Sequence, residues 1–247
     1  MDVIPIWLVF IGTVVIVVGS IEVGYRVGRA AFARCKGEKE SPASVMSQSL
    51  LALAAFMLAF AFGVVANRFE ARKHLVRLEA NAIGTAWLRA EFLSERDRNS
   101  SRDLMRKYVD VRVELHRNTD PENLKAVFNA SDRTHSRLWE IAVENARKEF
   151  NSPVVALYVE SLNELFDIHG LRVNQGLRAR IAGGIWISLV SLLVLGMISV
   201  GYQTAIAGSS RPRASAILAV SFALVISLIA DLDRPGGGTI GVPDQPL

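Results

Sequence analysis

Cysteine is nearly absent from this sequence of 247 residues, and charge is absent from four long stretches of it. The one cysteine, Cys35, cannot form an internal disulfide or a cysteine-based metal site. The sequence also has no Gly-x-Ser-x-Gly motif, no Cys-His pairing and no pair of carboxylates inside an apolar run. We therefore expect neither a disulfide scaffold nor an enzyme, and no bound cofactor.

The four uncharged stretches are predicted to cross a membrane. They are residues 3–21, 45–66, 181–201 and 214–230, and contain 19, 22, 21 and 17 residues. A spanning helix needs about 20 apolar residues, so the first three are long enough and the fourth is expected to extend to Asp231. No basic residue precedes the first stretch, which favours a retained helix over a cleaved signal peptide. The predicted class is an all-α membrane protein with four transmembrane helices.

Most of the charge lies between the second and third stretches. Residues 67–180 contain 20 Lys and Arg against 17 Asp and Glu, and this even balance excludes nucleic acid as an expected partner. We divide the chain into a first transmembrane pair (1–66), a helical soluble insert (67–180), a second transmembrane pair (181–231) and a C-terminal tail (232–247).

The insert is expected to be helical throughout. Ser94, Asp120-Pro121 and Ser152-Pro153 place a capping residue or a first-turn proline at three helix starts. Within the first of these helices, apolar side chains recur at helical spacing and predict its buried face: Leu104, Tyr108, Val111 and Leu115. Upstream, glycines at 63 and 84 each weaken a helix by about 1 kcal/mol without ending it. The second transmembrane helix should therefore continue into the insert as one helix of about 50 residues.

Basic residues do not decide on which side of the membrane the insert lies. Seven Lys and Arg lie in the two short connections, residues 24–44 and 202–213, and seven flank the insert. The positive-inside rule is balanced by these counts, so orientation stays open at this point.

The four histidines are scattered, and they give little support to a metal site. Asp132 and His135 are three residues apart and would share a helix face. No pair has the spacing and the glutamate of a helical zinc site. We therefore expect no bound metal ion.

Two segments carry a resemblance to a known family. The apolar run from Ser49 to Phe60 leads into Asn67-Arg68-Phe69-Glu70-Ala71-Arg72-Lys73, which resembles the second transmembrane helix of bestrophins and the segment after it. Phe69 stands where bestrophins carry a pair of tryptophans. Residues 79–86, together with Asp231-Leu232-Asp233-Arg234-Pro235, resemble more closely the bestrophin-like family of unknown function, over nearly the whole chain.

The resemblance implies the bestrophin fold, which has four spans per subunit and a helical cytosolic part. It also implies an assembly and an activity. Bestrophins are pentameric anion channels, so it implies a homo-oligomer, with five copies expected, that conducts anions such as chloride along a pore lined by the second helix. It also implies a multi-pass protein of the plasma (inner) membrane, in contact with membrane lipid, with the insert in the cytoplasm. A calcium clasp is not expected, because the full acidic run after the last helix is absent.

The resemblance also implies roles for six residues of the second helix. Phe56 and Phe60 share one face, where bestrophins carry a hydrophobic constriction that can gate by dewetting. Leu53 and Val64 extend this stripe as pore-lining residues, and Arg68 and Arg72 would stand at the pore mouth. Simpler explanations compete for both groups, since phenylalanines also face lipid and arginines also anchor a helix at the headgroups.

A second function fits the same pattern of helices. Four insert helices between two pairs of spans also describe a membrane sensor or interaction protein that conducts no ions. In that alternative the insert would lie outside the cell, so the two functions predict opposite orientations.

Overall fold

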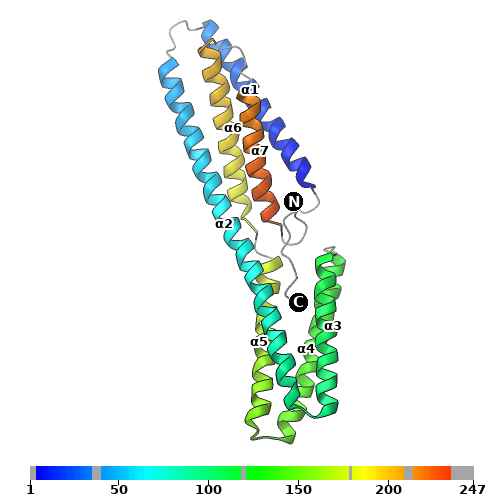
Figure 1. Ribbon diagram of the computed structural model, residues 1–247. Helices are drawn as coiled ribbons and strands as arrows, with labels where there is room; N and C mark the ends of the chain where they lie inside the picture. Colours follow the sequence, from blue (N-terminus) through cyan, green and yellow to red (C-terminus); the bar gives the residue numbers. More distant parts are fainter. Residues whose placement is uncertain (1–3, 35–39, 118–120, 178–179, 209–213, 235–247) are drawn as a thin grey trace. The chain divides into compact units, whose positions relative to one another are not determined.

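The computed structural model describes residues 4–34, 40–117, 121–177, 180–208 and 214–234. All regular secondary structure in these ranges is helical, which confirms the predicted all-α class (Figure 1). Two compact units are formed, one by residues 1–68 and 180–234 and the other by residues 69–179. One helix, α2 (Glu40–Arg89), contributes to both units.

The first unit contains the four predicted spans. Its helices are α1 (Ile6–Arg34), the first part of α2, α6 (Gly183–Ile206) and α7 (Ala214–Leu232). All four helices are long and apolar enough to cross a membrane, as predicted. Asp231 lies in the last turn of α7, so the fourth span does extend to it.

The connection expected over residues 24–44 is largely helical instead. Helix α1 continues thirteen residues beyond Ile21, the expected end of its span, and stops at Arg34. The glycines of this extension pack closely against α6: a Cβ atom at Gly24 would lie 1.9 Å from the Ile198 carbonyl oxygen. On the α6 side, a Cβ at Gly201 would lie 2.0 Å from the carbonyl oxygen of Ile21. Only glycine allows two helices to approach so closely.

Helix α2 confirms the prediction of one long helix through the end of the second span. It contains 50 residues, and neither Gly63 nor Gly84 interrupts it. A bilayer accommodates about 20 helical residues, so only the uncharged part, residues 45–66, matches the hydrocarbon core. The charged remainder, from Asn67 onward, is assigned to the soluble insert.

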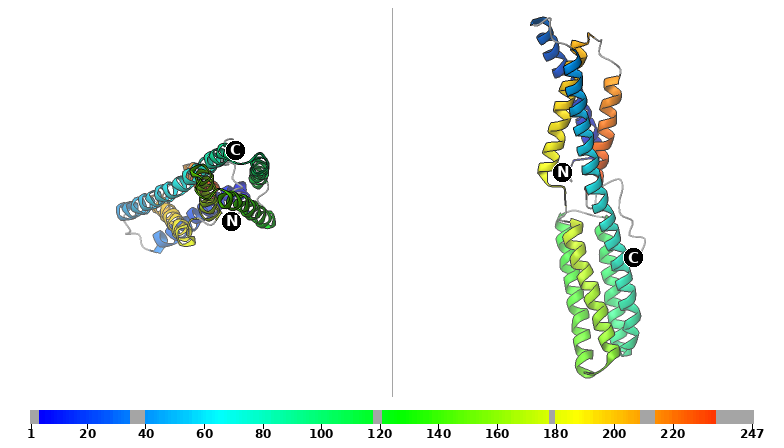
Figure 2. Two further views of the ribbon diagram at one scale, coloured as in Figure 1. Left: turned by 90° about the horizontal axis from the view of Figure 1, so that it is seen from below. Right: turned by 90° about the vertical axis from the view of Figure 1, so that its left-hand side faces the viewer.

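The second unit is a four-helix bundle that buries the C-terminal part of α2. The other members are α3 (Glu95–Arg117), α4 (Pro121–Lys148) and α5 (Pro153–Leu177), and the short 3-10 helix η1 (Ala90–Phe92) joins α2 to α3. Residues from all four helices form its core, including Ala86, Met105, Leu138 and Tyr158. Figure 2 shows these helices running along one another.

The predicted helix starts are confirmed, but the buried face of α3 is rotated from the predicted one. Ser94 Oγ accepts a hydrogen bond from the Asp97 backbone N–H at 3.3 Å, and α4 and α5 begin at Pro121 and Pro153. The buried positions of α3 are Ser101, Met105, Tyr108 and Arg112. Leu104 and Val111 are only partly buried. Arg112 lies on this buried face, where it is paired with a carboxylate of another helix.

Candidate functional site

The exposed face of α2 carries three of the six predicted pore residues. Phe56 is 67% exposed, Phe60 is 51% exposed and Leu53 is 47% exposed, while Ala54, Leu58, Ala61 and Val65 form the buried face. The two phenylalanines therefore do not pack the core of their own subunit. Their side chains are available to lipid or to another copy of the chain.

The other three predicted residues differ among themselves in exposure. Val64 and Arg68 are half-buried. Arg72 is buried, at 8% exposure, whereas a pore-mouth role calls for a side chain open to solution. In the segment after the last span, Asp233 Oδ1 accepts a hydrogen bond at 3.0 Å from the Ile181 backbone N–H, close to the start of α6.

A second candidate site lies inside the four-helix bundle, around Glu79. This side chain of α2 has no exposed area, and it is paired with arginines from two other helices. Arg112 Nη2 of α3 lies 3.3 Å from Glu79 Oε1, and Arg172 Nη1 of α5 donates a hydrogen bond to Glu79 Oε2. Burial alone raises the pKa of Glu79, but the two guanidinium groups outweigh it and hold this pKa below its usual value. Glu79 is therefore ionised at neutral pH.

Tyr108 connects this ion pair to a histidine. Its hydroxyl donates to Glu79 Oε1 at 2.6 Å and lies 2.9 Å from His169 Nδ1. The hydroxyl has one hydrogen and an ionised carboxylate can only accept, so His169 Nδ1 must donate to the tyrosine oxygen. The neutral ring is thus held with its hydrogen on Nδ1 and a lone pair on Nε2.

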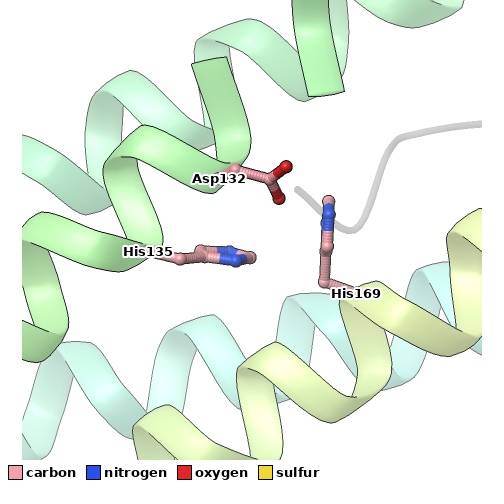
Figure 3. Close-up of side chains that lie close together, drawn as sticks. All are labelled: Asp132, His135 and His169. Atoms are coloured by element: carbon pink, nitrogen blue, oxygen red, sulfur yellow. The ribbon is translucent and has the colours of Figure 1, made fainter. Parts of the chain in front are cut away.

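A second histidine and a carboxylate complete the cluster. His135 of α4 packs against His169 of α5, with ring centroids 4.7 Å apart and the rings nearly perpendicular. One ligand atom from each of Asp132, His135 and His169 lies within 4.8 Å of the other two. Figure 3 shows the Asp132 carboxylate and the His135 ring, both from α4, facing the His169 ring across a common space.

Both histidines are neutral at physiological pH. Burial lowers the pKa of His135 to about 4, and the charge of His169 would lower it further if that ring were protonated. Burial, followed by the nearby Arg112, lowers the pKa of His169 to about 4. Neutral imidazole is the form that hydrogen-bonds through one nitrogen and offers a lone pair on the other.

Comparison with known proteins decides the family. The sequence matches the family model of the Bestrophin-like domain over residues 13–247. The chain belongs to this family. No curated protein and no solved structure matches it. The bestrophin-like assignment agrees with the resemblance carried by α2 and by the segment after α7, and the four apolar helices make this family member a membrane protein.

Sequence reasoning located the α2 stripe of this bestrophin-like protein but missed the Glu79 cluster. His135 and His169 are 34 positions apart, on different helices, so no spacing within one helix can pair them. Glu79 lies beside the small residues of α2, and a single glutamate on a helix does not indicate its partners on other helices. One signal did exist in the sequence. Arg112 follows Tyr108 by four positions, so its charge lies on the helix face that Tyr108 marks as buried.

Proposed function

We propose that this protein is an anion channel of the plasma (inner) membrane, in which several copies, expected to be five, surround a pore lined by α2. The observation that carries the proposal is the exposed stripe of Leu53, Phe56 and Phe60, on a helix whose opposite face is buried. Membership of the bestrophin-like family supports it, because the related bestrophins conduct anions along the corresponding helix. Conduction is passive, so the protein carries out no chemical reaction.

In this proposal the phenylalanines form the narrowest part of the pore. Rings of Phe56 and Phe60 around a symmetry axis would exclude water from a short hydrophobic segment and so control conduction by dewetting. Aromatic ring edges carry a partial positive charge, which favours an anion over a cation at the same place. Val64 continues the stripe, and Arg68 is the better placed of the two arginines to attract anions to the mouth, since Arg72 is buried.

Chloride flux from liposomes tests the proposal. Purified wild-type protein should release chloride faster than empty liposomes, and Phe56→Ala and Phe60→Ala should raise the flux by widening the constriction. The matched control is Phe62→Ala, because Phe62 lies on the same helix and is also exposed but projects in a different direction. The proposal fails if wild-type protein passes no chloride, or if all three variants change the flux equally.

The proposal places the insert in the cytoplasm. Asn99 is an exposed residue of α3, so a cysteine introduced there, after removal of Cys35, reports the side of the membrane. Protection from an impermeant thiol reagent in intact cells is expected for the channel. Labelling from outside would instead favour the alternative, a non-conducting sensor, for which the closed four-helix bundle of the insert is the supporting observation.

A further inference from the structure

The cluster of Asp132, His135 and His169 has the donor set of a metal centre. Two imidazoles and one carboxylate suit first-row transition metals such as zinc, whereas magnesium and calcium prefer oxygen ligands alone. Three protein ligands that leave a further position for water are also a common arrangement around zinc.

The hydrogen bonds of His169 prepare one of its nitrogens for a ligand. The Nδ1 hydrogen is used by Tyr108, whose hydroxyl in turn donates to Glu79. Metal-binding histidines commonly donate their other ring N–H to a polar partner, which fixes the tautomer and orients the ring. Glu79, Tyr108 and His169 form such a chain, and the nitrogen left for a ligand is Nε2.

His135 supplies a second observation, independent of the first. Its Nε2 atom is buried and has no hydrogen-bond partner among the residues that the structure describes. A buried polar atom without a partner is unfavourable by about 1–3 kcal/mol, so such atoms call for an explanation. A metal ion in the space shared with His169 and Asp132 would accept the lone pair of this nitrogen.

The charges around the cluster are compatible with a cation. Arg112 and Arg172 are compensated in part by Glu79, and Asp132 supplies a further negative charge beside the histidines. Asp132 is exposed, and the ligand atoms of the three residues lie within 4.8 Å of one another, so modest side-chain rotations would bring them to the separation of about 3.4 Å in a tetrahedral zinc site.

We propose that Asp132, His135 and His169 bind one divalent transition-metal ion of the zinc type, which ties α4 to α5. The site lies in the soluble bundle and not on the exposed α2 stripe. It does not depend on the protein being a channel, and its test uses no measurement of conduction.

Zinc binding by the full-length protein tests the proposal. The protein, carrying a tag without histidine, is reconstituted in nanodiscs, stripped with a chelator and dialysed against zinc chloride. Metal analysis should find one zinc ion per chain, bound at concentrations well below about 100 μM, and zinc should raise the thermal unfolding temperature. Magnesium and calcium should produce neither effect.

Three variants locate the ion. His135→Phe keeps an aromatic ring against Phe166 but removes the ligand atoms, and Asp132→Asn removes the charge of an exposed carboxylate. Each should weaken zinc binding by about tenfold or more. The control is His74→Phe, because His74 is exposed on α2, and it should bind zinc as the wild type does. Equal zinc binding by wild type, His135→Phe and Asp132→Asn would overturn the proposal, as would no binding at all.

Discussion

Tyr108 donates its hydroxyl hydrogen to Glu79 across 2.6 Å, and both side chains are sealed inside the four-helix bundle of the insert. This bond joins α3 to the C-terminal part of α2, the same helix whose N-terminal half carries the exposed phenylalanines. The buried network around Glu79 therefore fixes the part of α2 that continues beyond the membrane. Four predictions follow from this packing and from that of the transmembrane unit.

Removing the charge of Glu79 should destabilise the insert strongly. Glu79→Gln removes the carboxylate charge that pairs with the buried guanidinium group of Arg112, which is unfavourable by about 3–5 kcal/mol and should lower the unfolding temperature by roughly 10 °C. The matched control is Glu160→Gln, which breaks an exposed pair with Arg89 and should change stability by less than about 1 kcal/mol. Similar melting temperatures for the two variants would contradict the assigned role of Glu79.

The two buried tyrosine hydroxyls should differ in their contributions. Tyr108→Phe removes a hydrogen bond to a charged group and leaves His169 Nδ1 unpaired, so we expect a loss of about 1.5–3 kcal/mol. Tyr158→Phe removes only a 2.9 Å bond to the Ser101 hydroxyl, and a loss of about 0.5–1.5 kcal/mol is expected. Thermal unfolding of both variants measures the difference. A larger loss for Tyr158→Phe would show that the Glu79 bond is unimportant.

Stability should fall between pH 7.5 and pH 5.5 in metal-free protein. His135 and His169 have pKa values of about 4 in the fold, against 6.5 in an unfolded chain, so only the unfolded chain takes up protons in this window. Each histidine then removes about 1.4 kcal/mol of stability. The groups that face them are Asp132, Tyr108, and the partly compensated set of Glu79, Arg112 and Arg172.

The matched variants separate these histidines from other titrating groups. His135→Phe should lose about half of the pH effect, whereas His74→Phe, at an exposed position, should keep all of it. An unfolding temperature that is the same at both pH values in the wild type would contradict the neutral, buried state of the two rings.

Replacing glycine by alanine in the transmembrane unit should destabilise the protein at one position and stabilise it at another. Gly201→Ala places a methyl group 2.0 Å from the Ile21 carbonyl oxygen, so α1 and α6 must separate, and folded yield should drop. Gly19→Ala meets no atom within 4 Å and should gain up to about 1 kcal/mol through higher helix propensity. Size-exclusion profiles and thermal unfolding of the two variants compare them. Equal tolerance would mean that α1 and α6 do not approach closely at Gly201.

The elements that were predictable from the sequence depend on local patterns. Uncharged runs of spanning length identified four membrane helices, and the absence of proline between residues 43 and 93 identified α2 as one long helix. Ser94 and Pro153 marked helix starts because their effect extends over a single turn. These signals need no knowledge of how helices pack.

The features that could not be predicted depend on contacts between helices. Arg112 is buried because Glu79, on another helix, neutralises it, and a pattern of apolar residues alone assigns arginine to the surface. His135 and His169 meet only because α4 and α5 pack side by side. Gly24 of α1 and Ile198 of α6 are far apart in the sequence, and only the packing of the two helices shows that they approach closely.

We propose that several copies of α2 enclose one shared path. The first measurement to make is the native mass of the protein in a lipid nanodisc, because it gives the number of copies. Five copies of the 27.0-kDa chain give a protein mass of about 135 kDa, which is the result we predict. A monomer or a dimer would contradict the claim, because one or two copies of α2 cannot surround a pore.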